Sequence, residues 1–582
     1  MKFTLSWLKD HLDTQATAAE IGDVLTNLGL ELEGLENKAE ELAPFRVAYV
    51  KEAAQHPNAD RLKVCTVDPG DGSAVQVICG APNAKTGMKG VFAPVGSYVP
   101  GIDTTLKAGK IRGVESNGML VSEREMGISD EHEGIIELDP DAPVGEGFAK
   151  VMGLDDPVFD IAITPNRADC LGVRGVARDL AAAGLGTLKD DPRLAAVAGS
   201  YDPPMQWRRD LPAGAEDACP YVGGRHFRNV QNGESPAWMQ QRLRAIGLRP
   251  ISALVDITNY VTFDLGRPLH VFDAAKVKGD LTMRLARDGE QLEALDEQTY
   301  SLDPETIVIA DEAGVQGIGG LMGGQDSGVT QDTTEVFLEV ALFDPIRIAT
   351  AGRRLGLLSD ARFRFERGLD PESADWGEAV ATRLIQEICG GEASHLTAAG
   401  EIPRTRQQID LRVARVGELG GLEIGAKTCR RILDDLGFET SSSDGGGDSE
   451  VIQATVPPWR VDVESEACLV EEVLRINGYD AIPTVPLPPL TAVPQAAVTP
   501  ALRRGELARA ALATRGMNEA VTFSFMSSRH AGQFGGQVSD LYLANPISSE
   551  LDVMRPVVLA NLVEAGARNA DRGFPDVALF EV

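Results

Sequence analysis

Apolar residues near the N-terminus recur at the spacing of one helix face. The positions are Ile21, Val24, Leu25 and Leu28. Thr17 and Glu20 precede them in the arrangement of a capping box, and Gly29 follows them as a helix end. A second helical pattern covers Val173–Ala183, and residues 1–38 are predicted to be mainly helical.

From about residue 40 to 150 the pattern changes to short apolar runs separated by glycine and proline. The runs are FRVAYV, RLKVCTVD, VQVICG, GVFAPVG and GIIELD. Several short strands at this spacing predict a small β-barrel. One part of it is basic, because only Asp103 offsets Lys85, Lys89, Lys107, Lys110 and Arg112. Such a face can bind phosphates, or it can be an ordinary solvated barrel surface.

The stretch from Val456 to Gly478 changes from an extended to a helical pattern. Two prolines and β-branched residues disfavour helix at its start, and Gly478 ends the helix. The helical positions are Leu469, Val470, Val473, Leu474 and Ile476. The corner carries Asp462, Glu471 and Glu472. Three carboxylates at such a corner can hold a hard cation, or they can be surface charge, with Glu471 supporting Arg475.

Residues 255–370 contain the densest set of candidate site residues. His270 closes the phrase GRPLH, and five glycines lie within residues 317–324. A glycine-rich loop lets the backbone approach a ligand, although such loops also form plain turns. Glu339 lies in the apolar run VFLEVALFDP, where an unpaired carboxylate is costly, so it needs a structural arginine or a ligand hydroxyl. His270 alone is compatible with a structural or a site role.

Length and composition indicate a multidomain protein of the cytoplasm. The chain has 582 residues, and 43% of them are hydrophobic. It has no transmembrane-length apolar run or signal peptide, and its seven scattered cysteines form no CxxC pair. The net charge of −32 argues against nonspecific coating of nucleic acid and suits a selective RNA binder with local basic islands.

Polar and proline-containing stretches along the chain predict the segment boundaries. A polar boundary lies near 188–218, a new segment begins after Pro403, and Pro483–Pro494 form an extended connector. Ser235 and Pro236 predict a helix start, with Ser235 as its N-cap. The last residues, 574–582, predict an apolar strand. Because a native terminus inside a core strand is unusual, we expect the sequence to be incomplete at this end.

Phrases throughout the chain resemble the beta subunit of bacterial phenylalanine–tRNA ligase. HPNADRLKV, ICGAPN and IRGVESNGM are similar to its tRNA-binding OB-fold, and the 255–370 phrases are similar to its B3/B4 editing module, in the same order. Residues 456–479 resemble its B5 module, and EAVTFSF with NPISSELDVMR resembles its catalytic-like domain.

The resemblance implies a multidomain α+β fold. The implied parts are a helical/α+β B1 module (1–38 and 151–190), an OB-fold (39–150), a mixed α/β B3/B4 module (215–400), a B5 module (404–482) and an incomplete class II synthetase-like catalytic-like domain (496–582). It also implies an α2β2 tetramer with an alpha subunit that binds ATP and activates phenylalanine. This chain would bind tRNA(Phe) and scaffold alpha.

The resemblance further implies the roles of individual residues. The editing pocket, which hydrolyses misacylated Tyr-tRNA(Phe), would comprise Asn259, His270, Gly319, Gly320, Glu339, Ser359 and Ala361. Asp462, Glu471 and Glu472 would bind a Mg²⁺ ion shared with alpha, although Cys468 replaces a fourth acidic residue of the family pattern. The basic residues of the barrel would contact tRNA. The competing hypotheses are a tRNA-binding scaffold with an inactive pocket and a free-standing deacylase.

Overall fold

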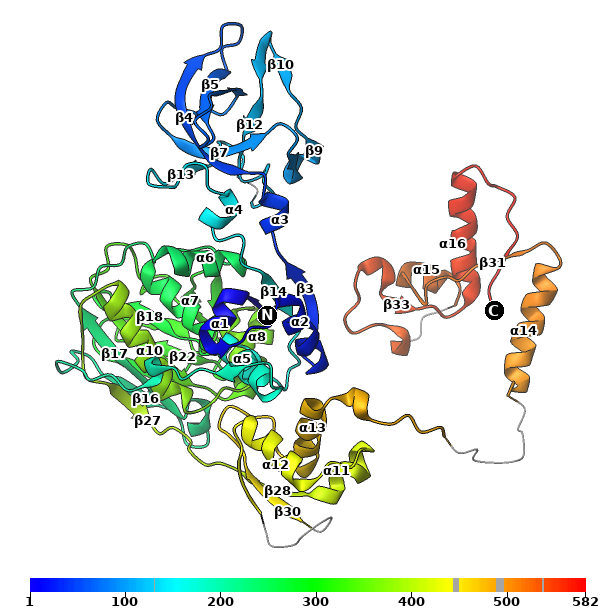
Figure 1. Ribbon diagram of the computed structural model, residues 1–582. Helices are drawn as coiled ribbons and strands as arrows, with labels where there is room; N and C mark the ends of the chain where they lie inside the picture. Colours follow the sequence, from blue (N-terminus) through cyan, green and yellow to red (C-terminus); the bar gives the residue numbers. More distant parts are fainter. Residues whose placement is uncertain (130, 443–449, 488–496, 536–538) are drawn as a thin grey trace. The chain divides into compact units, whose positions relative to one another are not determined.

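The computed structural model describes residues 1–129, 131–442, 450–487, 497–535 and 539–582 (Figure 1). The chain forms two compact units, Met1–Pro483 and Thr484–Val582, which are described separately. Much of the predicted connector at 483–494 lies outside the described residues. Among the described helices, none combines the length and the apolar character needed to span a bilayer.

The N-terminal module joins two segments on either side of the barrel. Its elements are β1 (Lys2–Thr4), α1 (Leu5–His11), β2 (Leu12–Asp13), α2 (Ala18–Asn27), β3 (Leu32–Glu36), β14 (Val158–Ile161), α5 (Val173–Ala182) and β15 (Thr187–Leu188). Strand β14 lies between β1 and β3, and the capping box of Thr17 and Glu20 is confirmed. The helical prediction for residues 1–38 was incomplete, because this segment also contains β1 and β3, which are strands that pair with β14.

The predicted barrel strands all form. They are β4 (Arg46–Gln55), β5 (Lys63–Asp68), β6 (Val75–Cys79), β7 (Lys89–Pro94), β12 (Gly118–Leu120) and β13 (Glu137–Leu138). The strand order is β12-β7-β4-β5-β6. The ends of this order approach each other, because the Asn117 N–H donates to the Gln76 carbonyl at 2.9 Å and the Ile78 N–H donates to Ser116 Oγ at 3.0 Å. The five strands therefore curl into a barrel.

The middle region contains two sheets that face each other. The first has the order β18-β25-β17-β26, with β27 also paired to β17, and comprises β17 (Tyr221–Arg228), β18 (His270–Asp273), β25 (Glu335–Leu342), β26 (Glu392–Ala393) and β27 (Thr397–Gly400). The second has the order β16-β19-β22-β23-β24, and comprises β16 (Trp207–Asp210), β19 (Leu281–Leu285), β22 (Ile307–Ala310), β23 (Val315–Ile318) and β24 (Met322–Gly323). Buried side chains of both sheets, including Phe272, Ile309 and Phe337, form one core.

The N-terminal module and the middle region share a second core. Trp7 of α1 stacks on Tyr260 of α7 (Ala253–Leu265) at 5.2 Å, and both belong to one buried cluster with Leu338 of β25 and Val380 of α10 (Ser373–Ile388). The sequence boundary near 188–218 therefore does not separate two independent cores. The helix predicted after Ser235 forms as α6 (Ala237–Ala245), but Ser235 is not its N-cap, because its hydroxyl donates to the Asp256 carboxylate.

The 404–482 segment folds around a three-stranded sheet. Its elements are β28 (Gln408–Arg412), β29 (Glu439–Ser442), β30 (Val451–Thr455), α11 (Val413–Gly420), α12 (Ala426–Asp435) and α13 (Glu466–Asn477). The predicted helix before Gly478 is confirmed as α13. The extended arm is shorter than predicted, because β30 ends at Thr455 and Asp462 lies in a turn.

The unit from Thr484 to Val582 is built from short elements. They are α14 (Pro500–Ala513), β31 (Asn518–Glu519), β32 (Phe525–Met526), α15 (Ser528–Gln533), β33 (Val553–Met554), α16 (Val558–Asp571) and β34 (Leu579–Phe580). The predicted strand near residue 580 is β34, which pairs in parallel with β31.

Candidate functional site

A cavity of about 440 Å³ opens beside the glycine-rich loop of the middle region. Its lining includes six of the seven predicted pocket residues, namely Asn259, His270, Gly320, Glu339, Ser359 and Ala361. The seventh, Gly319, is absent from the lining. A side chain at Gly319 would meet Ile307 and Phe343, two residues of the buried core between the sheets.

His270 and Glu339 lie opposite each other on neighbouring antiparallel strands. They are register partners of β18 and β25, which places both side chains on the same face of the sheet. Both line the cavity. Two residues 69 positions apart in sequence are therefore brought together by strand pairing.

Glu339 is a buried carboxyl group that has no hydrogen-bond or ion-pair partner among the described residues. Its exposure is 6%. Burial raises the pKa of Glu339 to about 8, against a lowering influence of the nearby Arg267 guanidinium. Arg267 is itself fully buried and donates to the Ala341 carbonyl and to Ser373 Oγ. At neutral pH Glu339 is mainly a neutral acid that can donate and accept a hydrogen bond.

His270 is held neutral by its surroundings. Burial lowers the pKa of His270 to about 4. Its Nε2 is buried and has no hydrogen-bond partner in the described structure. The imidazole packs edge-on against Phe272 at 4.5 Å and lies over Gly323, where an added Cβ would be 2.4 Å from Cε1. Gly323 thus leaves the space that the ring occupies.

Ser359 connects the glycine-rich loop to the helix below the cavity. It caps α9 (Asp360–Phe365) by accepting from the Arg362 N–H at 3.0 Å, and its hydroxyl donates to the Leu321 carbonyl at 2.8 Å. Its contribution to the pocket is therefore positional. Gly320, with a φ of +68°, takes the left-handed conformation that this loop requires.

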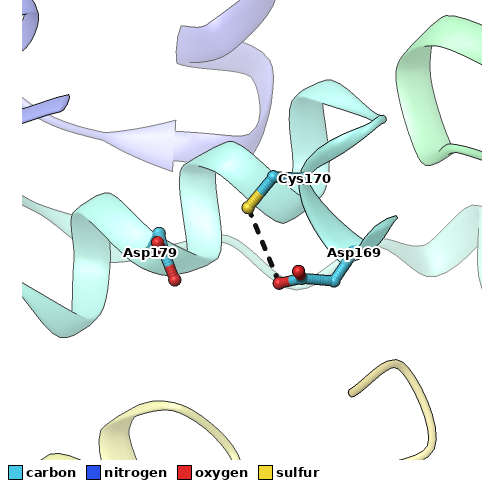
Figure 2. Close-up of side chains that lie close together, drawn as sticks. All are labelled: Asp169, Cys170 and Asp179. Carbon is cyan, nitrogen blue, oxygen red and sulfur yellow. Dashed lines mark hydrogen bonds between the residues drawn. The ribbon is translucent and has the colours of Figure 1, made fainter. Parts of the chain in front are cut away.

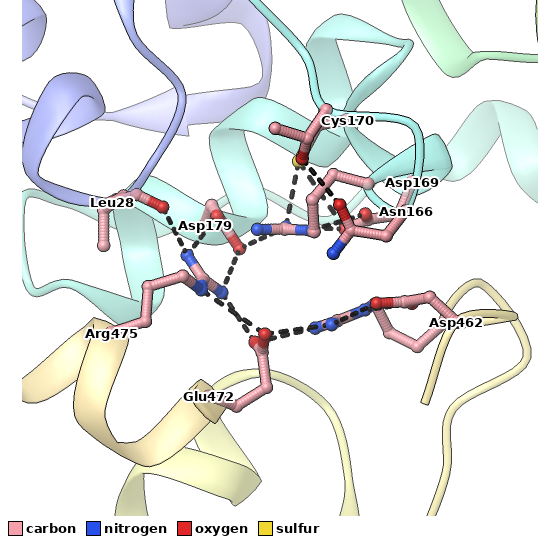
Figure 3. A network of polar contacts seen from close by, with 11 residues as sticks. Leu28, Asn166, Asp169, Cys170, Asp179, Asp462, Glu472 and Arg475 are labelled. Carbon is pink, nitrogen blue, oxygen red and sulfur yellow. Dashed lines mark hydrogen bonds and ion pairs between the residues drawn. The ribbon is translucent and has the colours of Figure 1, made fainter. Parts of the chain in front are cut away.

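The structure does not bring Asp462, Glu471 and Glu472 together as a cation site. Arg460 contacts Asp462 at 2.8 Å and Glu472 at 2.7 Å, and Glu472 also pairs with Arg475 (Figure 3). Although burial favours the neutral acid, Arg475 and Arg460 lower the pKa of Glu472 to about 2. Two carboxylates are thus compensated by arginines, whereas Glu471 is exposed, so the arrangement does not fit a bound Mg²⁺.

The same arginines bind the corner to the N-terminal module. Arg475 pairs with Asp179 of α5 at 2.7 Å and donates to the Leu28 carbonyl, and Arg167 bridges Asp169 and Asp179 (Figure 3). This buried ionic network joins α13 to α5. Its charges alternate in sign, which is the condition for burying them at tolerable cost.

Asp169, Cys170 and Asp179 lie close enough to suggest a metal site (Figure 2). Both carboxylates are, however, engaged by Arg167. Burial raises the pKa of the Cys170 thiol well above its ordinary value, so the sulfur is not a thiolate. This group belongs to the ionic network and does not fit a metal.

The basic residues of the barrel differ in their availability. Lys85 pairs with Glu137 at 2.7 Å, and Lys89 is half-buried and donates to a backbone carbonyl at 2.7 Å. Lys110 lies 3.6 Å from a carboxylate. Lys107 and Arg112 are exposed, and no described residue pairs with their side chains. Lys107, Lys110 and Arg112 lie in or just before the hairpin of β10 (Gly109–Ile111) and β11 (Val114–Ser116).

Comparison with known proteins decides the family. The chain is 54% identical over 582 residues to the phenylalanine–tRNA ligase beta subunit of Brucella abortus (strain 2308), covering all of this chain and 71% of that protein. It is 54% identical over 583 residues to the beta subunit of Rhodospirillum rubrum, covering 72% of it. The chain belongs to the phenylalanine–tRNA ligase beta-subunit family.

Four family models match successive parts of the chain. They are a putative tRNA binding domain (45–147), the B3/4 domain (218–390), the tRNA synthetase B5 domain (409–479) and the phenylalanyl tRNA synthetase beta chain CLM domain (482–582). An N-terminal fragment of the beta subunit from Pyrococcus horikoshii is a structural neighbour at 15% identity and a TM-score of 0.30, covering 56% of this chain and 88% of the fragment. The cavity described above lies within the B3/4 match.

Sequence reasoning assigned no role to Arg267. The signal that could have found it is its place in the phrase GRPLH, three residues before the predicted site residue His270. Such an arginine must have buried acceptors, and the structure supplies Ala341 and Ser373. Its effect on Glu339 could not be predicted from the sequence, because the two residues lie on different elements.

Proposed function

We propose that this chain hydrolyses tyrosine misattached to tRNA(Phe) in the B3/4 cavity. The observation that carries the proposal is the pair of His270 and Glu339, which line one cavity. The buried His270 Nε2 and the Glu339 carboxyl have no hydrogen-bond partner in the described part of the chain. Buried polar groups of this kind are normally satisfied, so their partner is expected to be a ligand.

Glu339 would select tyrosine through its hydroxyl. As a neutral acid it can donate to the phenol oxygen or accept from the phenol O–H. Phenylalanine would fill the same space and leave the carboxyl unsatisfied, at a cost of about 1–3 kcal/mol. That difference corresponds to roughly 5- to 150-fold discrimination. An apolar pocket that selects phenylalanine for attachment to tRNA rejects an added hydroxyl only weakly. A second site that requires the hydroxyl would remove the tyrosine that the first site accepts by error.

His270 would position the attacking water or the terminal ribose. As a neutral imidazole it can hold a water by donating or accepting without carrying charge into the cavity. The Ser359 hydroxyl is already engaged, and we assign it and Ala361 to pocket shape, with Asn259 and Gly320. Gly319 would support the loop from the core side. No covalent nucleophile is required, because a positioned water can attack the ester directly.

We further propose that the chain works in the cytoplasm, as its seven free cysteines suggest, in an α2β2 assembly with an alpha subunit that binds ATP. tRNA binding would use the barrel hairpin residues Lys107, Lys110 and Arg112, with Lys85 and Lys89 contributing only after losing their present partners. A Mg²⁺ shared with alpha at Asp462, Glu471 and Glu472 stays a prediction, and it would require these carboxylates to lose their contacts with Arg460 and Arg475.

Deacylation of preformed Tyr-tRNA(Phe) and Phe-tRNA(Phe) by this chain with its alpha subunit tests the proposal. We expect selective loss of the tyrosyl ester. Glu339→Ala should abolish the preference for tyrosine, whereas His270→Ala should slow hydrolysis and keep the preference. Glu335→Gln is the matched control, because Glu335 is an exposed carboxylate on the same strand.

Two outcomes would contradict the proposal. If neither ester is hydrolysed while tRNA still binds, the chain is a scaffold with an inactive pocket. If both variants hydrolyse both esters at the wild-type rates, hydrolysis takes place elsewhere. Activity that persists fully without the alpha subunit would instead favour a free-standing deacylase.

A further inference from the structure

A second cavity, of about 280 Å³, lies where three parts of the Met1–Pro483 unit meet. Its lining includes Arg178 of α5, Asp370 from the loop before α10, Trp376 in the first turn of α10, and Trp459 from the turn before α13. None of these residues takes part in the editing cavity. The cavity is therefore a separate feature, enclosed by the N-terminal module, the B3/4 region and the B5 segment.

Arg178 brings a stacked guanidinium to this cavity. It lies over the Trp459 ring at 4.1 Å, and its buried Nη1 has no hydrogen-bond partner among the residues that the structure describes. Burial lowers the pKa of Arg178, and Asp169 opposes this effect more than Asp370 does. None of the described acidic residues forms an ion pair with Arg178. A planar cation held by stacking and left with free donors is suited to a carboxylate or a phosphate.

Asp370 is a carboxyl group on the same lining that also lacks a cationic partner among the described residues. It accepts the Glu372 N–H at 2.8 Å and interacts with Trp376. Burial raises its pKa, although Arg178 is close enough to act in the opposite direction. Arg178 and Asp370 are thus opposite charges that line one cavity without closing on each other.

We propose that this cavity binds a small apolar α-amino acid, with its carboxylate on Arg178 and its ammonium on Asp370. The remaining walls include Leu188, Leu265 and Pro458 beside the two indoles, which suit an apolar side chain. The other charged lining residues have partners of their own, namely Asp169, Arg174 and Glu372. The volume lies just below the usual range of about 300–1,000 Å³ for small-molecule pockets, so it suits an amino acid better than a nucleotide. The inference does not depend on editing activity.

An amino acid matches these observations better than an inorganic anion does. Phosphate would neutralise Arg178 but would place negative charge beside Asp370 and leave the apolar walls unfilled. A zwitterion neutralises both groups at once and desolvates no charge without a partner. A ligand bound there would contact all three parts of the unit and stabilise them against separation.

Equilibrium dialysis of this chain with radiolabelled L-phenylalanine tests the proposal. In the wild-type chain, the unsatisfied Glu339 carboxyl disfavours phenylalanine in the editing cavity. We therefore expect one site per wild-type chain, weakened about tenfold or more by Arg178→Met or by Asp370→Asn. Arg431→Met is the matched control, because Arg431 is an exposed arginine of α12. Thermal unfolding verifies that each variant folds.

Competition against the same label keeps the test valid if a variant fails to fold. We expect 3-phenylpropionate, which lacks the ammonium, and 2-phenylethylamine, which lacks the carboxylate, each to compete at least about tenfold less well. Equal competition by 3-phenylpropionate or effective competition by phosphate would overturn the proposal. So would binding that survives both cavity variants, or binding that Glu339→Ala abolishes, which would assign it to the editing cavity.

Discussion

The perturbed Glu339 makes the stability of the B3/4 sheet depend on pH in a way that Glu339→Gln should remove. The pKa of this carboxyl is raised from an ordinary value of 4.5 to about 8 by burial. The folded state therefore holds the proton more tightly than the unfolded state. The stability that the protonated Glu339 gives the folded state is fully present below pH 4.5. It is lost progressively as the pH rises towards 8, and it changes no further above pH 8.

The magnitude follows from the interval between the two pKa values. Each pH unit of the interval contributes about 1.4 kcal/mol, so the wild-type sheet should lose at most about 5 kcal/mol between pH 4.5 and pH 8. Glutamine has nearly the same shape and stays neutral at every pH. The variant should therefore match the wild type at low pH and exceed it increasingly as the pH rises.

Amide hydrogen exchange of the peptide that contains β25 measures this effect locally, which matters in a chain with several cores. The intrinsic pH dependence of exchange is common to both proteins, so it cancels in the ratio of their protection factors. We expect that ratio to grow with pH in favour of Glu339→Gln and to level off above pH 8. A ratio that is constant across this range would refute the raised pKa and the neutral acid at the site.

Three further predictions concern other parts of the chain. Gly323→Ala should displace the His270 ring and slow ester hydrolysis by about a hundredfold without unfolding the chain, as deacylation and circular dichroism together will test. Arg475→Met should leave buried carboxylates uncompensated and cost about 3–5 kcal/mol, measurable as a lower urea midpoint, whereas an unchanged midpoint would refute the network. Lys107→Ala should weaken tRNA binding and lower the salt slope by about 0.7–0.9, and Lys85→Ala should do neither, because Lys85 is already paired.

Local sequence patterns predicted the elements of this fold well where residues close in sequence determine the structure. The capping box at Thr17 and Glu20 and the helix before Gly478 were confirmed because caps and glycine act over a few residues. The failures arise where distant parts meet. Strand β14 pairs with β1 across the whole barrel insertion, and Ser235 donates to Asp256 instead of capping its helix. Neither contact has a signal in the neighbouring sequence.

The acidic corner illustrates the same limit for a candidate site. Carboxylates at 462 and 472 are equally suitable for a cation and for arginine, and the sequence shows Arg460 and Arg475 beside them. The arrangement is decided by Asp179, almost 300 positions earlier, which pairs with Arg475 and orients it towards Glu472. The sequence motif thus shows which acidic residues are present, whereas contacts with distant residues determine which of them already have arginine partners.

In the B3/4 cavity, the partners of a buried carboxyl group distinguish a structural role from a proposed functional one. Asp179 and Glu472 are as buried as Glu339, yet each has arginine partners that account for its presence. Glu339 has none among the described residues, and Arg267, the nearby cation, directs its donors to Ala341 and Ser373. A carboxyl that raises the free energy of the folded chain and forms no hydrogen bond or ion pair among the described residues is expected to contact a ligand. The destabilisation predicted above pH 4.5 and the proposed selection of a hydroxyl therefore have one cause, the lack of a partner for Glu339 among the described residues.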